Sequence, residues 1–94
     1  VNGGHDEMNV EQARSIIVRP YITEKIYTKM DKEDILAFIV HDKADKPRIK
    51  EAIKTLYNVE AVDVNTARTI YGKKAFVKFQ TGVARDLATK LGLV

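Results

Sequence analysis

The chain has 94 residues, of which 45% are hydrophobic and 31% charged, and its net charge is +3 at neutral pH. This length supports one small hydrophobic core and leaves little room for a deep catalytic cavity. The absence of Cys excludes disulfides and thiolate chemistry, and no apolar run reaches the roughly 18 residues of a membrane span, so we expect a soluble intracellular protein.

The first elements are a tail and a short strand. Residues 1–14 are polar and aperiodic, and we expect them to form a flexible tail ahead of a single domain over residues 15–94. The β-branched run from Ser15 to Arg19 predicts a strand, which Pro20 ends.

A short helix and a central strand follow. Thr23 is a suitable N-cap for a helix over Glu24–Met30, and Glu24 adds negative charge at the positive end of that helix. After a polar turn over residues 31–34, the continuously apolar run Ile35–Val40 predicts a strand in the middle of the sheet.

The strongest helical pattern lies in the middle of the chain. Asp45 precedes Lys46-Pro47, as is typical of a helix start, and apolar residues then recur at steps of three and four up to Tyr57. Asn58 suits a left-handed exit, after which the alternation over Val59–Arg68 predicts a strand with one buried face.

The remaining elements are a strand and a helix. A short turn around Gly72 leads into the strand Lys74–Phe79, and a last helix is expected from Val83 to Leu91. The predicted order is β-α-β-α-β-β-α, and the tight turn requires an antiparallel pair. We therefore expect an α+β fold with an antiparallel four-stranded sheet and unevenly placed helices, an α/β plait of the ferredoxin-like or RNA-recognition-motif-like type.

Positive charge is concentrated in the second part of the chain. Residues 1–42 carry 5 Lys or Arg and 8 Asp or Glu, whereas residues 43–94 carry 11 and 5. This asymmetry favours a polyanionic partner, although an ordinary solvated surface can have the same composition.

Lysine and aromatic residues share the last predicted strand. Cations and flat rings on a sheet suit phosphates and stackable bases, which predicts RNA binding. The alternative is that Lys73, Lys74 and Lys78 keep a sheet edge soluble. Phe76 and Phe79 lie three residues apart and so point to opposite faces, which indicates that one of them meets a partner or a covering helix. A second group of cations, Lys43, Lys46, Arg48 and Lys50, surrounds the predicted start of the long helix, where free N–H groups favour phosphate.

Signatures of catalysis are absent from the sequence. There is no P-loop, no dinucleotide motif and no recognisable arrangement of a nucleophile with His and an acid. His5 and His41 are isolated and do not predict a metal site. We therefore expect no enzyme activity, no cofactor and no small-molecule substrate.

Two family resemblances assign different roles to these residues. The segment Ala75–Phe79 resembles the second half of the RNA-recognition-motif signature, and Ala37–Val40 is a weaker echo of the partner strand. This resemblance implies a freestanding module for single-stranded RNA, in which Phe76 is exposed beside Phe38 as a stacking platform.

The second resemblance covers residues 18–94. It rests on short segments in a fixed order: Pro20-Tyr21-Ile22-Thr23-Glu24-Lys25, Phe38-Ile39-Val40, Ala44-Asp45-Lys46 with Ile49-Lys50, Leu56-Tyr57-Asn58-Val59, Val64-Asn65-Thr66 and Lys73-Lys74-Ala75. In these segments the chain resembles the large-subunit ribosomal protein L twenty-three family. Its short connection from Ala67 to Lys73 is similar to archaeal and eukaryotic members, because bacterial relatives carry a long basic hairpin there.

This second resemblance implies a cytoplasmic, ribosome-bound structural protein. Its expected partners are large-subunit rRNA at the rim of the polypeptide exit tunnel, neighbouring large-subunit proteins, and nascent-chain factors that include the signal recognition particle and the protein-conducting channel. The resemblance implies that Phe76 is largely covered, and that Glu24 either docks a factor or only begins its helix. It assigns rRNA contacts to Thr23, Lys25, Lys46, Lys50, Asn65, Thr66, Lys73 and Lys74, and the residue patterns add Lys43 and Arg68.

Overall fold

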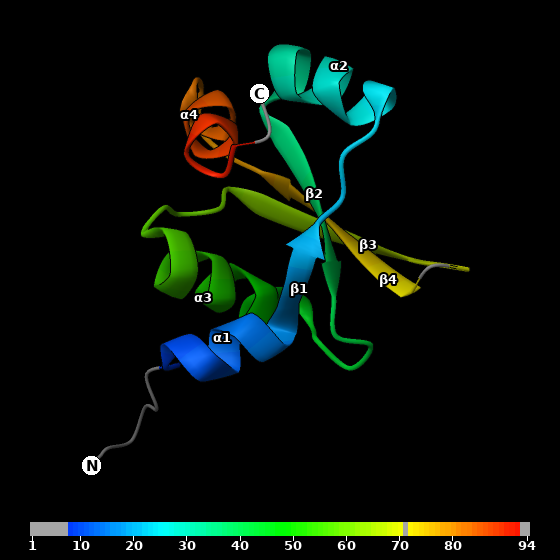
Figure 1. Cartoon of the computed structure of the whole chain (residues 1–94), viewed down its shortest axis with the longest axis vertical. Helices are drawn as coiled ribbons and strands as arrows, with labels where there is room; N and C mark the ends of the chain where they lie inside the picture. The colour runs from blue at the N-terminus through cyan, green and yellow to red at the C-terminus, as the bar shows by residue number, and fades with distance from the viewer. Residues whose placement is uncertain (1–7, 71, 93–94) are drawn as a thin grey trace.

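The computed structural model describes residues 8–70 and 72–92 (Figure 1). Its four strands form one antiparallel sheet in the order β1-β2-β4-β3. The predicted α+β class with a four-stranded antiparallel sheet is therefore confirmed. The elements are α1 (Val10–Ile16), β1 (Ile17–Pro20), α2 (Glu24–Glu33), β2 (Ile35–Val40), α3 (Lys46–Tyr57), β3 (Asp63–Thr69), β4 (Gly72–Lys78) and α4 (Val83–Lys90).

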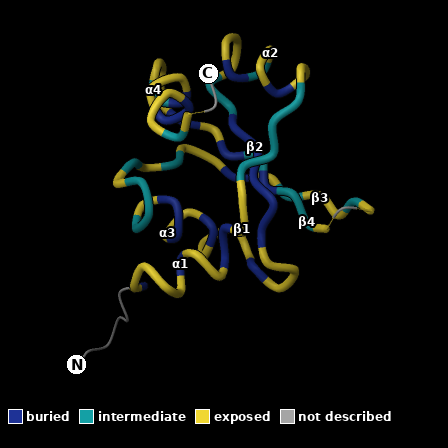
Figure 2. Tube along the Cα trace, viewed as in Figure 1, coloured by how far each residue is buried: buried dark blue, intermediate teal, exposed yellow. Residues whose placement is uncertain are grey.

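Strand β2 lies inside the sheet, between β1 and β4, as its apolar sequence predicts. Five of its six residues are buried, and Figure 2 shows it as one of the most continuously buried segments. Leu36 and Phe38 belong to the main core, whereas Ala37 and Ile39 point to the other face of the sheet.

The two faces of the sheet are covered unequally. Helices α1, α3 and α4 lie on one side, while α2 lies over one end of the sheet beside β2 and α4 (Figure 1). We call the first side the helix-covered face and the other the open face. Ala75, Val77 and Phe79 enter the core, and Phe76 is half-buried on the open face, so the predicted separation of Phe76 from Phe79 is confirmed.

Helix α3 forms as its sequence pattern predicts. The Asp45 side chain accepts a hydrogen bond from the Arg48 N–H at 3.0 Å, which satisfies one of the free donors of the first turn. Ile49, Ala52 and Ile53 form its buried side. Asn58 ends the helix with a left-handed backbone at φ 58°.

The segment before β1 differs from the prediction. Part of the expected tail forms helix α1, which also includes Ser15, so the first strand begins at Ile17 and not at Ser15. The side chain of Asn9 accepts from the Gln12 N–H at 2.8 Å, and the Gln12 side chain accepts from the Asn9 N–H at 3.1 Å. This reciprocal cap begins the helix.

Burial against α3 stabilises the short helix α1. Ala13 and Ile16 are buried in the main core, and α1 packs along α3. A seven-residue helix is marginal on its own, so tertiary packing decides its presence. Residues 1–7 of the expected tail lie outside the described residues.

Other bounds differ from the prediction by a few residues. Helix α2 continues to Glu33, and most of the predicted turn is its last helical turn. Strand β3 begins at Asp63, four residues after the predicted start at Val59. Strand β4 begins at Gly72, whose positive φ of 114° suits glycine, and ends before Phe79.

Asp34 connects three parts of the fold. It ends α2 in a left-handed conformation at φ 55°, and its carbonyl accepts from the Phe79 N–H at 2.9 Å. Its side chain accepts from the Gly82 N–H at 2.8 Å. The end of α2 is thereby held against the turn between β4 and α4.

Replacing Asp34 tests this connection. We expect Asp34→Ala to lower the free energy of unfolding by about 1–2 kcal/mol, because it removes a hydrogen bond and leaves Ala in a left-handed backbone. Asp34→Asn keeps an acceptor and tolerates that backbone, so its loss should be smaller. Urea denaturation measures both variants, and equal losses would contradict this role of the side chain.

Tyr57 makes stability sensitive to alkaline pH. Its ring stacks on Phe38 with a centroid distance of 6.0 Å, and burial raises the pKa of its phenol. The folded pKa of Tyr57 exceeds the unfolded value, so burial of the neutral phenol is favoured over burial of the phenolate. The stability that the Tyr57 side chain contributes is therefore fully present below about pH 10 and is lost as pH rises through the folded pKa. We expect the stability of Tyr57→Phe to improve relative to the unsubstituted chain above about pH 10, as measured by urea denaturation; a constant difference would contradict the assignment.

Candidate nucleic-acid interface

The register of the strands aligns a row of side chains across the open face. Arg19 of β1 pairs with Ile39 of β2, which pairs with Lys74 of β4, and Lys74 pairs with Ala67 of β3. Directly paired residues share a face, so these four side chains form one row on the open face. The Arg at the start of the row is exposed, and the Lys within it is half-buried.

A second row beside it adds an aromatic ring and an amide. Ala37 pairs with Phe76, and Phe76 pairs with Asn65. Asn65 is exposed on this face, whereas Thr66 alternates to the helix-covered face and is half-buried. The structure therefore separates two neighbouring residues that the sequence prediction treated together.

Tyr21 joins this surface from the end of β1. Its N–H donates to the Ala37 carbonyl at 2.9 Å, so the chain continues alongside β2. The Lys74 ammonium lies over the Tyr21 ring, 3.8 Å from the centroid. This cation–π contact places a positive charge and a flat ring together, the combination that phosphates and bases recognise.

A groove separates α2 from the open face. The Thr23 hydroxyl caps α2 by accepting from the Ile26 N–H at 3.3 Å, as predicted, while Glu24 and Lys25 are exposed on its first turn. The groove brings together three of the predicted RNA-binding residues. Its lining includes Tyr21, Thr23, Lys25, Ile26, Lys74 and Phe76.

A second basic surface surrounds the loop between β2 and α3. All four of its cations are exposed, and within residues 8–70 and 72–92 none of them forms an ion pair. We call this group the loop cluster. It consists of Lys43, Lys46, Arg48 and Lys50.

Arg68 and Lys73 contact the protein itself. Arg68 forms an ion pair with Asp42, and the Lys73 ammonium donates to the Ala44 carbonyl at 2.6 Å. Both partners lie in the loop between β2 and α3. These two predicted RNA-binding residues therefore hold the loop that carries Lys43.

Sequence reasoning missed two members of the open face, Arg19 and Tyr21. The sequence placed Arg19 in a strand, but only the pairing of β1 with β2 shows which face it occupies. Tyr21 belonged to the ribosomal resemblance without an assigned contact, and its position over β4 depends on the path of the chain after Pro20.

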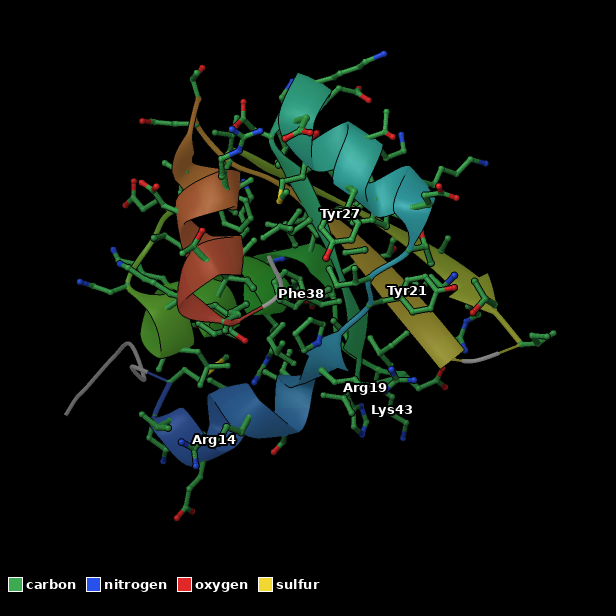
Figure 3. The ribbon with its side chains drawn as sticks, turned by 45° about the horizontal axis from the view of Figure 1, so that its top comes forward. Arg14, Arg19, Tyr21, Tyr27, Phe38 and Lys43 are labelled. Atoms are coloured by element: carbon green, nitrogen blue, oxygen red, sulfur yellow. The ribbon has the colours of Figure 1, made fainter. Side chains whose placement is uncertain are left out.

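The paired stacking platform of an RNA-recognition motif is absent. Phe38 is 0% exposed and lies on the helix-covered face against Tyr57, whereas Phe76 lies on the open face beside α2. Figure 3 shows Phe38 among the helices and Tyr21 on the other side of β2. The expectation that Phe38 and Phe76 are exposed together is therefore wrong.

The described part of the chain contains no group of three or more His, Asp or Glu residues placed to hold a metal ion. None of the helices in this part has the length and apolar character to cross a membrane.

Comparison with known families gives a match over most of the fold. A family model described as Ribosomal protein L23 matches residues 15–90. This span runs from the last turn of α1 to the end of α4 and includes both basic surfaces.

The chain is also similar to curated proteins from several eukaryotes. It is 42% identical over 82 residues to the large ribosomal subunit protein uL23 of Tetrahymena thermophila, a match that covers 85% of this chain and 55% of that protein. For uL23B of Caenorhabditis elegans the identity is 42%, with 85% and 56% covered. For uL23B of Schizosaccharomyces pombe it is 43%, with 84% and 57% covered. The chain thus spans a little over half the length of these relatives.

The contact between Lys73 and the loop can be tested by substitution. We expect Lys73→Met to reduce the free energy of unfolding by about 1–2 kcal/mol, because the aliphatic stem is kept while the Ala44 carbonyl loses a charged donor. Lys78→Met, an exposed position on the same strand, is the matched control. Urea denaturation measures both, and equal stability of the two variants would contradict the role of Lys73.

Proposed function

The chain belongs to the ribosomal protein L23 family, and from this premise we propose that it is a structural component of the large ribosomal subunit that binds large-subunit rRNA. The observation that carries the proposal is the family match over residues 15–90, which includes every strand of the sheet. The family is one of structural proteins and not of enzymes.

The basic surfaces support rRNA as the partner. The loop cluster presents cations that are not neutralised by described carboxylates, and such cations bind backbone phosphates. On the open face, Lys74 and Arg19 lie beside Tyr21 and Phe76, where rings can stack on unpaired bases.

The polar residues at these surfaces add hydrogen bonds. Asn65 is exposed on the open face and suits contacts to the RNA backbone or to 2′-hydroxyl groups. Thr23 and Lys25 extend the surface across the groove to α2. We propose that Thr66, Arg68 and Lys73 also approach the RNA, with Arg68 and Lys73 acting partly through the loop that they hold.

The finer parts of the proposal come from the family resemblance. We propose that the protein lies at the rim of the polypeptide exit tunnel, beside neighbouring large-subunit proteins in cytoplasmic ribosomes. We also propose that it contributes to the docking surface for the signal recognition particle and the protein-conducting channel. The exposure of Glu24 on the first turn of α2 supports a docking role for this residue.

Binding to rRNA tests the central proposal. We expect the chain to bind large-subunit rRNA and to sediment with the large subunit after a high-salt wash. The double variant Arg19→Gln/Lys74→Gln should weaken rRNA binding about 10-fold and lower the slope of log affinity against log salt by about 1–2, because it removes two cations from the open face.

The control for this experiment has the same change in net charge. Lys32→Gln/Lys90→Gln alters exposed lysines at the C-terminal ends of α2 and α4, away from both basic surfaces. It should reduce affinity much less. Recovery of the unsubstituted chain only in light, soluble fractions, without salt-dependent rRNA binding, would overturn the proposed function.

Glu24→Lys tests the docking role. We expect ribosomes that contain this variant to bind the signal recognition particle several-fold more weakly, because reversing one exposed charge changes a protein contact. Binding to rRNA should not weaken, because Glu24 lines the groove and the change replaces an anion there by a cation. Asp86→Lys, at an exposed acidic position in the first turn of α4, is the control for the same reversal of charge. Unchanged binding by Glu24→Lys would leave Glu24 with a role only at the start of its helix.

A further inference from the structure

A hollow between α1 and the loop after β2 offers a site for one phosphate group. We propose that this hollow binds a single backbone phosphate of RNA, an inference that rests on the proposed function and specifies one of its contacts. The hollow involves residues that the sequence prediction did not assign to RNA. Its lining consists of Gln12, Ser15, Ile16, His41, Lys43, Ala44 and Arg48.

Three basic side chains line the hollow. Lys43 and Arg48 are exposed and carry full positive charges, and Figure 3 shows Lys43 near the junction of α1 and β1. His41 Nδ1 accepts from the Lys43 N–H at 3.1 Å. In the neutral imidazole the proton therefore lies on Nε2, which is a donor.

The chemistry of these donors suits phosphate. An Arg guanidinium can donate two parallel hydrogen bonds to phosphate oxygens, and a Lys ammonium adds a compact charge. Ile16 and Ala44 are buried and add apolar atoms to the lining.

The loop is held in place before any ligand binds. The His41 N–H donates to the Ile16 carbonyl at 2.8 Å, and the Ala44 N–H donates to the His41 carbonyl at 3.0 Å. From the other side, Lys73 donates to the Ala44 carbonyl at 2.6 Å. The backbone that carries Lys43 therefore needs little reordering when a ligand binds.

The described carboxylates near the hollow in the chain do not form ion pairs with its cations. Asp42 forms an ion pair with Arg68, and Asp45 caps α3 through the Arg48 N–H. Glu11 lies one turn before Ser15 on α1 and accepts the Ser15 hydroxyl through its carbonyl, not its carboxylate. Within the described residues neither Lys43 nor Arg48 has an ion-pair partner.

The other two cations of the loop cluster lie outside the lining of the hollow. Lys46 and Lys50 are exposed on the first turns of α3, two positions before and after Arg48, and so project from a different side of the helix. An RNA that follows both sides of the start of α3 can place one phosphate in the hollow and others on these lysines. A polyanion of regularly spaced phosphates therefore fits better than an isolated anion.

The test is rRNA binding by a double variant of the hollow. We expect Lys43→Gln/Arg48→Gln to weaken binding to large-subunit rRNA about 10- to 100-fold and to lower the salt slope by about 1, because one phosphate contact with two charged donors is lost. Phosphate-ethylation interference should show one phosphate whose modification impairs binding of the unsubstituted chain and no longer impairs binding of this variant.

Lys32→Gln/Lys90→Gln again serves as the matched control and should retain that interference. Equal weakening by the two double variants, or an unchanged interference pattern, would overturn the phosphate site while leaving rRNA binding intact. Absence of rRNA binding by the unsubstituted chain would instead overturn the proposed function itself. All four residues altered in the two double variants are exposed. Thermal denaturation should therefore show that both variants remain folded.

Discussion

The burial of β2 on both of its faces is the constraint on which the rest of the structure depends. One face of this apolar strand packs against the core formed with α1, α3 and α4. The other face has only α2 at one end, yet Ile39 is 7% exposed. Arg19 and Lys74 pair with Ile39 on the neighbouring strands, and the apolar stems of such long side chains can cover it. Residues such as Lys74 therefore protect the sheet and present charge at the same time.

Two groups of cations around the loop after β2 have different roles. Arg68 and Lys73 contact Asp42 and Ala44 and so hold the loop after β2. The cations of the loop cluster have no ion-pair partner among the described residues, so their positive potential extends into the solvent. A modest net charge of +3 thus conceals a local excess, and local excess governs the approach of a polyanion.

The two basic surfaces lie on different parts of the molecule. One follows the open face toward α2, and the other lies at the end of β2, near α1 and α3 (Figure 1). A folded RNA can contact both surfaces, whereas a short single strand on a flat sheet reaches only one. This arrangement is consistent with recognition by shape and backbone, as proposed for a component of the large subunit.

Local chemistry made much of the fold predictable. The N-cap at Asp45 and the apolar spacing of α3 are local signals that predict a helix without knowledge of its tertiary position. The unbroken apolar run of β2 likewise predicted a central strand. By contrast, α1 is short and its signal was only the cap from Asn9 to Gln12, which sequence reasoning overlooked; burial of Ala13 and Ile16 against α3 decides that it forms.

The candidate site was predictable in its residue types but not in its arrangement. The sequence by itself determined the family, the strand alternation and the surplus of cations in the second part of the chain. Only the tertiary structure decided that Phe38 is buried, that Asn65 and Thr66 face opposite ways, and that Lys74 covers Tyr21. The physical reason is that strand register and chain path bring together residues distant in sequence, and the partner of each charged side chain depends on that assembly.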